Sequence, residues 1–85
     1  MNMLKKYKND IAYLAEQETF NLRMRDSYKL YSDDYNYYQE LFGIYFRARL
    51  AVTREAKQQH PSFNVEKFMM SLPDWCTGES TEDEK

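Results

Sequence analysis

Few residues of this chain could perform nucleophilic catalysis. The single cysteine, Cys76, and the single histidine, His60, are sixteen residues apart, with Pro61 and Pro73 between them. A thiolate nucleophile needs a histidine within hydrogen-bond reach and usually a third group that orients it. Nothing in this spacing brings such groups together, so we expect a non-catalytic protein without catalytic residues. A histidine at a helix end has a structural use there, because its protonated ring interacts favourably with the helix dipole.

Residues that could hold a metal or a phosphate are equally scarce. One histidine and one cysteine cannot supply the four ligands of a zinc site, and Asp33-Asp34 lacks the ligand spacing of a calcium loop. Two glycines, Gly43 and Gly78, cannot build a glycine-rich phosphate-binding loop. The sequence therefore predicts no bound metal and no cofactor.

Basic residues form two groups that could contact nucleic acid, one before the middle of the chain and one after it. These groups are Arg23, Arg25 and Lys29, and Arg47, Arg54 and Lys57. Basic side chains near aromatic rings can bind phosphates and stack on bases. The isoelectric point of about 5.3 nevertheless lies far below that of domains that bind nucleic acid through charge. A solvated helix face is the simpler interpretation, and a small nucleic-acid-associated regulator is the alternative function.

Tyrosine is the most informative residue type, with eight copies in 85 residues. Six aromatic residues keep a 3-4-3-4-3 spacing through the middle of the chain: Tyr28, Tyr31, Tyr35, Tyr38, Phe42 and Tyr45. Such a stripe can pack inside the fold, but tyrosines beside acidic and amide groups are typical of protein interfaces. The pattern alone leaves both readings open. The candidate partner-binding residues are Tyr31, Tyr35, Tyr37, Tyr38, Asp33 and Asp34.

The composition indicates one small helical domain that positions these residues. Hydrophobic residues make up 42% and charged residues 31% of the chain, as in globular proteins, and the net charge is −2. Glycine and proline total four, too few for the turns of a sandwich or barrel. We find no apolar stretch long enough to span a membrane and no signal peptide at the N-terminus. A lone cysteine favours a reducing compartment, so we expect a cytoplasmic protein.

Hydrophobic periodicity and capping residues predict an all-α domain over residues 1–76, with helices at 4–24, 34–59 and 64–72. Ser32 to Asp34 can cap the second helix, His60-Pro61 ends it, and Asn64 can cap the third. The stretch 19–32 stays open, because its alternating apolar residues also permit a short β-hairpin. Residues 77–85 are acidic without an apolar anchor, which predicts a disordered tail.

The segment 41–52 is the most apolar part of the chain, since nine of its twelve residues are hydrophobic. It should be the central, most buried element, and a close helix crossing would give a reason for its glycine. A domain of this size has too few other residues to cover it, so we also expect a twofold homodimer through this helix. The expected dimer contacts are Leu41, Gly43, Ile44, Ala48 and Val52.

The C-terminal half of the chain carries a short sequence pattern that recurs in other proteins. It consists of Phe46-Arg47-Ala48-Arg49-Leu50, followed by His60-Pro61-Ser62-Phe63-Asn64-Val65-Glu66-Lys67-Phe68 and then Cys76. This pattern resembles small uncharacterised helical proteins of bacteriophages and mobile elements, which close with Pro-x-Phe-Asn or Pro-x-Phe-Asp, a second Phe and a cysteine. The resemblance covers residues 46–76, implies a phage-like origin and transfers no catalytic residue. Together these features predict an interaction protein that modulates or inhibits a host protein complex of the bacterial cytoplasm, such as defence or nucleic-acid-processing machinery.

Overall fold

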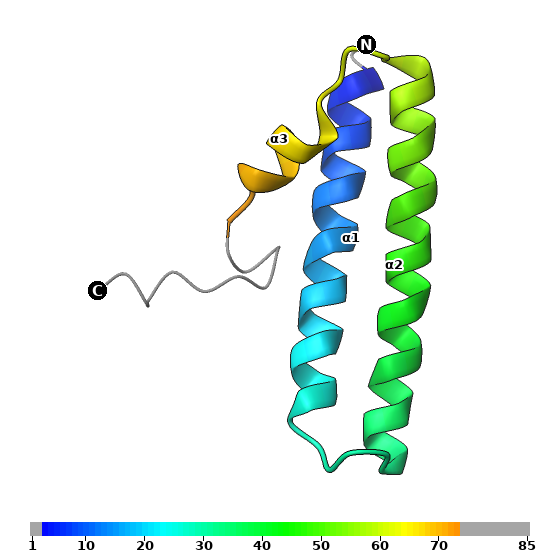
Figure 1. Cartoon of the computed structure of the whole chain (residues 1–85), viewed down its shortest axis with the longest axis vertical. Helices are drawn as coiled ribbons and strands as arrows, with labels where there is room; N and C mark the ends of the chain where they lie inside the picture. Colours follow the sequence, from blue (N-terminus) through cyan, green and yellow to red (C-terminus); the bar gives the residue numbers. More distant parts are fainter. Residues whose placement is uncertain (1–2, 74–85) are drawn as a thin grey trace, which may run out of the picture.

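A computed structural model describes residues 3–73 and shows three helices, α1 (Met3–Asp26), α2 (Asp33–Gln59) and α3 (Val65–Met70). The two long helices form an antiparallel hairpin, and α3 lies beside the N-terminal half of α1 (Figure 1). The all-α prediction is confirmed, including two long helices and one short one. No strand occurs within residues 3–73, so the alternative of a β-hairpin over 19–32 is wrong. Cys76 and the acidic segment 77–85 lie outside the described residues.

The helix ends follow the capping residues of the sequence. Ser32 is the N-cap of α2, and its hydroxyl accepts a hydrogen bond from the Tyr35 backbone N–H at 3.2 Å. Asn64 caps α3 in the same way, accepting from the Lys67 backbone N–H at 2.9 Å. His60 is the C-cap of α2, as expected of a residue that precedes proline.

The first helix is longer than its periodicity predicts and continues to Asp26. Arg23 and Arg25 occupy its last turn, where positive charge interacts favourably with the helix dipole. The Ser27 hydroxyl then donates to the carbonyl oxygen of Met24 at 2.6 Å, which satisfies one of the terminal acceptors. These local interactions stabilise the helical conformation of the segment, so its alternating apolar residues do not form a strand.

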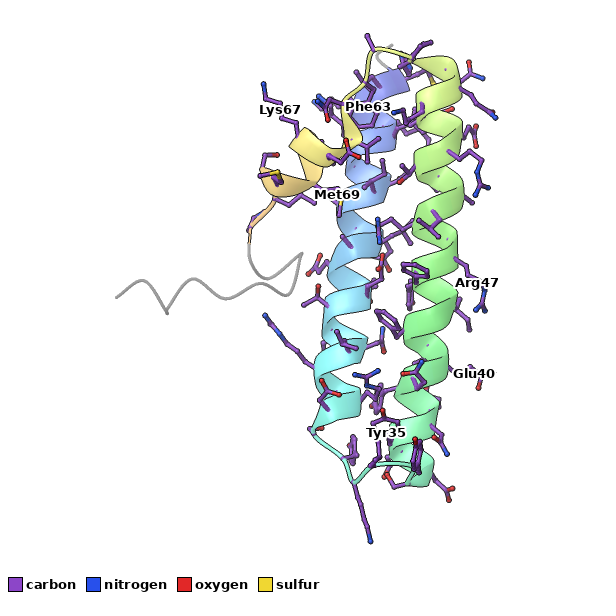
Figure 2. The ribbon with its side chains drawn as sticks, viewed as in Figure 1. Tyr35, Glu40, Arg47, Phe63, Lys67 and Met69 are labelled. Atoms are coloured by element: carbon purple, nitrogen blue, oxygen red, sulfur yellow. The ribbon has the colours of Figure 1, made fainter. Side chains whose placement is uncertain are left out.

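The hydrophobic core lies at the end of the hairpin where α3 packs. Its buried apolar residues are Tyr7, Ile11, Ala15, Ala56 and Phe63. In Figure 2, Phe63 lies beside the N-terminal turns of α1, which places the turn between α2 and α3 over this end of the hairpin. The opposite end, around the loop between α1 and α2, is only two helices thick (Figure 1).

The expectation that segment 41–52 is the most buried element is wrong. All of its residues remain at least partly exposed, whereas α1 contributes six of the buried residues of the described chain. The physical reason is that a two-helix hairpin covers only one side of each helix. Segment 41–52 is apolar on more than one side, so its outer side chains stay accessible.

The glycine of α2 also has no close helix crossing within the chain. A Cβ atom added at Gly43 would approach only the Nη1 atom of Arg47, at 3.3 Å, which is the end of a flexible side chain. Glycine costs about 1 kcal/mol relative to alanine in a helix interior. Nothing in the described part of the chain offsets that cost.

A partly buried ion pair joins the two long helices near their middle. The Arg49 guanidinium donates from Nε to the Glu18 carboxylate and also lies 5.6 Å from the centre of the Phe46 ring. Burial raises the pKa of Glu18 above its ordinary value, although the hydrogen bond and the charge of Arg49 both act to lower it. Closer to the core, the Tyr7 hydroxyl donates to Glu55 at 2.9 Å, and this bond, with burial, raises the pKa of Tyr7.

Candidate protein-binding site

The candidate site is the end of the hairpin at the loop between α1 and α2, and we call it the tyrosine tip. It comprises Tyr28, Leu30, Tyr31, Tyr35, Tyr37 and Tyr38. The first three belong to the loop and the others to the first turns of α2. Figure 2 places Tyr35 at this end, distant from Phe63 and the core.

Hydrogen bonds within the loop hold its backbone in one conformation. The Ser32 N–H donates to the Lys29 carbonyl at 3.0 Å, and the Asn36 N–H donates to the Ser32 carbonyl at 2.9 Å. The Asn36 side-chain amide also donates to the carbonyl of Tyr31 at 3.4 Å. The loop is therefore a short, ordered helix–helix connection.

Ring contacts order the tyrosine side chains relative to one another. Tyr28 stacks on Tyr38 with ring centres 5.8 Å apart and planes nearly parallel, and Tyr37 meets Tyr38 edge-on at 5.0 Å. Tyr31 meets Tyr35 edge-on at 5.9 Å. Aromatic pairs at such distances contribute about 0.5–1.5 kcal/mol beyond the area they bury. The five tyrosine rings thus form two groups, Tyr28 with Tyr37 and Tyr38, and Tyr31 with Tyr35.

Much of this aromatic surface is accessible to solvent. The exposed fraction is 76% for Tyr31, 59% for Leu30 and 58% for Tyr37. Contiguous exposed apolar groups mark interaction sites more often than isolated ones. The structure therefore divides the stripe: Tyr28 and Tyr31 at its loop end are exposed, whereas the later members are half-buried, namely Tyr35, Tyr38, Phe42 and Tyr45.

Tyr31 adopts a left-handed backbone conformation, with φ of 66°. For a bulky residue this is a strained geometry that costs on the order of 1–3 kcal/mol. Glycine or asparagine would be the usual choice at such a position. A tyrosine there extends a large amphipathic ring into solvent, which is an arrangement suited to contact with another molecule.

Charged residues flank the tip. Two of them are exposed aspartates, and one is an arginine whose charge is already paired. Asp33 and Asp34 are exposed in the first turn of α2, where they also interact favourably with the helix dipole. Arg25 forms an ion pair with Asp26 at 2.8 Å, donates to Gln39 at 2.6 Å and lies 5.3 Å from the Tyr35 ring centre. Lys29, exposed in the loop, adds one positive charge beside the two aspartates, so the net free charge at the tip is still acidic.

The structure brings together all six residues that the sequence proposed for partner binding. Sequence reasoning named Tyr28 only as part of the stripe and missed Leu30 as a site residue. The signal for Leu30 was weak, because a single leucine between Lys29 and Tyr31 has no periodic neighbour. Its exposure depends on the loop conformation, which the pattern does not determine.

Of the remaining chemical candidates, His60 lies among the described residues and Cys76 does not. His60 packs edge-on against Tyr7 at 6.0 Å, and its Nε2 atom is buried without a hydrogen-bond partner. Within residues 3–73 no three histidine, cysteine or acidic side chains gather as metal ligands would. An open hollow of about 400 Å³ lies between α1 and α3, where the Lys8 ammonium is 5.8 Å and 5.7 Å from the ring centres of Phe63 and Phe68.

The basic residues of the nucleic-acid alternative are spread over three elements. Arg23 is exposed on α1, Lys29 lies in the loop, and Arg25 is held by the contacts just described. On α2, Arg47, Arg54 and Lys57 are all exposed. Only this last group lies on one helix, where its three side chains share one face.

The residues expected to form a dimer contact differ in their exposure and in the side of α2 on which they lie. Ile44 is 47% exposed, while Leu41, Gly43 and Ala48 are half-buried. Val52 packs against the hydrophobic core and faces α1, so it points away from the exposed side of α2.

No helix in the described part of the chain is both long and apolar enough to cross a membrane. Comparison with protein-family models, curated proteins and solved structures found no match to this chain.

Proposed function

We propose that this protein is a non-catalytic interaction protein that binds a larger protein partner through the tyrosine tip. The observation that supports the proposal is the exposed, strained Tyr31, which lies in an ordered loop and packs edge-on against Tyr35. Tyrosine is enriched among the residues that contribute most to protein interfaces, because it buries much area and loses little side-chain freedom.

The position of the tip in the fold supports the same function. The core that stabilises the chain lies at the other end of the hairpin, so the tip can carry exposed aromatic residues without taking part in that core. The ordered rings and loop also lower the entropy lost on binding. Acidic Asp33 and Asp34 favour a partner surface with basic groups at its rim and disfavour nucleic acid phosphates.

The partner class that we propose is a protein complex of a bacterial host, in line with the phage-like pattern of residues 46–76. Binding at the tip would modulate or inhibit such a complex by occupying its surface, since no catalytic group is needed for that effect. Defence and nucleic-acid-processing machineries are the host complexes that we would search first.

The test compares capture of proteins from bacterial lysate by the wild type and by a Tyr31→Ser, Tyr37→Ser variant. A Tyr13→Ser variant is the matched control, because Tyr13 is also exposed, at 55%, but lies in α1 outside the tip. We expect the wild type and the control to recover the same proteins and the tip variant to lose them. Equal recovery by a tip variant with unchanged circular dichroism would remove the tyrosine tip from the proposal.

The alternative function, a nucleic-acid-associated regulator, draws on the exposed Arg47, Arg54 and Lys57 of α2. Binding through such a face would weaken steeply with salt, because neutralised phosphates release counterions. Titration of duplex DNA with micromolar protein at about 50 mM salt would detect even non-specific affinity. No binding under those conditions would exclude this function.

A further inference from the structure

The side of α2 that faces away from α1 carries an unusual set of exposed residues, which we call the outer face of α2. It consists of Glu40, Gly43, Ile44, Arg47, Leu50 and Ala51. These positions recur at spacings of three and four and therefore share one face of a helix. Figure 2 shows Glu40 and Arg47 projecting from α2 on the side opposite α1.

Apolar side chains on this face lie in solvent among its charged residues. Ile44 is 47% and Leu50 39% exposed, and Ala51 is exposed between them in the helical projection. A solvated helix face normally carries charged and polar residues there. Within residues 3–73, neither Glu40 nor Arg47 forms an ion pair, so both charges are available to another molecule.

Two pairs of opposite charges on α2 are placed symmetrically about the level of Gly43 and Ile44. Glu40 and Arg47 are each 3.5 residues, or about 5 Å of helix, from the midpoint between Gly43 and Ile44. Asp33 and Arg54 are each 10.5 residues, or about 16 Å, from the same midpoint. The acidic member of each pair lies on the N-terminal side and the basic member on the C-terminal side.

We propose that a second copy of this chain docks antiparallel on the outer face of α2, with the twofold axis at the level of Gly43 and Ile44. This axis sets Glu40 of each copy opposite Arg47 of the other, and Asp33 opposite Arg54. An isologous contact must be complementary to itself, and this charge order meets that requirement. A parallel arrangement would instead bring like charges together.

The close approach of the two helices also explains the glycine. Only the flexible guanidinium of Arg47 lies near the position that a Cβ atom of Gly43 would occupy. An antiparallel partner places its Ile44 at that position, once Arg47 turns toward Glu40 of the second copy. The contact keeps Gly43 and Ile44 of the sequence prediction and replaces Val52, which faces α1, with Leu50 and Ala51.

This inference does not depend on the proposed function of the tyrosine tip. The outer face lies along the middle of α2 and includes no residue of the tyrosine tip, although Asp33, which flanks the tip, lies opposite Arg54 at the edge of the contact. A failure of dimerisation and a failure of partner binding would therefore be separate results.

The experiment measures the mass of the protein by sedimentation equilibrium between 10 and 100 µM, as an order-of-magnitude range for weak dimers. We expect the wild type to dimerise. Glu40→Arg or Arg47→Glu alone should raise the dissociation constant at least about tenfold, because each creates two like-charge contacts across the axis. The double variant, E40R with R47E, should recover the wild-type dissociation constant.

Two further variants separate this contact from general effects of charge or folding. Glu16→Arg on α1 changes the net charge by the same amount as E40R and should leave the dimer intact. Gly43→Leu should abolish the dimer while circular dichroism shows an unchanged or higher helix content. A monomeric wild type at about 100 µM, unaffected single variants, or a double variant that is not restored would each overturn the proposal.

Discussion

Replacing Arg49 with methionine tests the energetic role of the ion pair in the middle of the hairpin. The change keeps a long apolar side chain near Phe46 but leaves the Glu18 carboxylate without its partner. The Glu18 side chain is only 10% exposed, against 18% for Arg49. Breaking a buried pair costs about 3–5 kcal/mol, and partial exposure of both groups reduces the expected loss at pH 7 to about 2–3 kcal/mol.

The stability lost in the Arg49→Met variant should depend on pH, and the raised pKa of Glu18 sets the direction of that dependence. Burial already raises the pKa of Glu18, so the folded chain holds a proton there more tightly than the unfolded chain. The contribution of this group to stability therefore falls as pH rises from the ordinary pKa of a glutamate through the raised value. Loss of Arg49 raises the folded pKa further, so the difference from wild type should be small near pH 4 and full near pH 7.

Urea denaturation followed by circular dichroism at several pH values between 4 and 7 measures this effect. A chain of 85 residues has a total stability of about 4–13 kcal/mol, so a loss of 2–3 kcal/mol is large. Glu18→Gln is the matched variant and should cost only about 1 kcal/mol, because its amide still accepts from Arg49 and the guanidinium can reach water. Equal losses for the two variants, or a loss for Arg49→Met that is independent of pH, would refute this reasoning.

Three other substitutions test the fold. Ile11→Ala should destabilise the chain by about 3 kcal/mol, since Ile11 is fully buried; a urea midpoint within error of the wild type would contradict the position of the core. Ser32→Ala should cost about 1 kcal/mol through loss of the cap to Tyr35, which thermal unfolding can detect, and Ser62→Ala, in an exposed position, is its control. Tyr31→Gly should raise stability by up to about 1 kcal/mol because it relieves the left-handed backbone, while it weakens partner capture; a destabilised glycine variant would argue against strain at this residue.

The sequence predicted the helices well because their ends depend on local chemistry. Ser32, His60 and Asn64 act on backbone groups within four residues, so their effect can be read without knowing the rest of the fold. Helical spacing places Tyr35 and Tyr38 on one side of α2, but Tyr31 lies in the loop, so its contact with Tyr35 depends on the loop conformation. Two helix lengths differ clearly from the prediction. The first helix runs two residues further, to Asp26, because weak alternation after Glu18 concealed a favourable C-terminal turn, and the third is shorter, Val65–Met70 instead of 64–72.

Burial was predicted less well because it depends on contacts between elements. Segment 41–52 is the most apolar part of the chain, yet the fully buried residues gather where α1, Ala56 and Phe63 meet. Apolar content shows how much surface a segment could bury, and the number of neighbouring helices decides how much it does bury. The pairing of Glu18 with Arg49 was likewise beyond prediction, because 31 residues separate them in the sequence.

The Glu18–Arg49 pair also fixes the alignment of the two long helices along their common axis. Two further hydrogen bonds join α1 and α2, from Tyr7 to Glu55 and from Arg25 to Gln39. A slide of one helix along the other by one turn, about 5.4 Å, would break these bonds as well as the ion pair. A slide would move the Glu18 carboxylate away from its guanidinium and strand both charges among apolar groups. The ion pair therefore favours one register of α1 against α2. In that register, Tyr28 of the loop stacks on Tyr38 of α2.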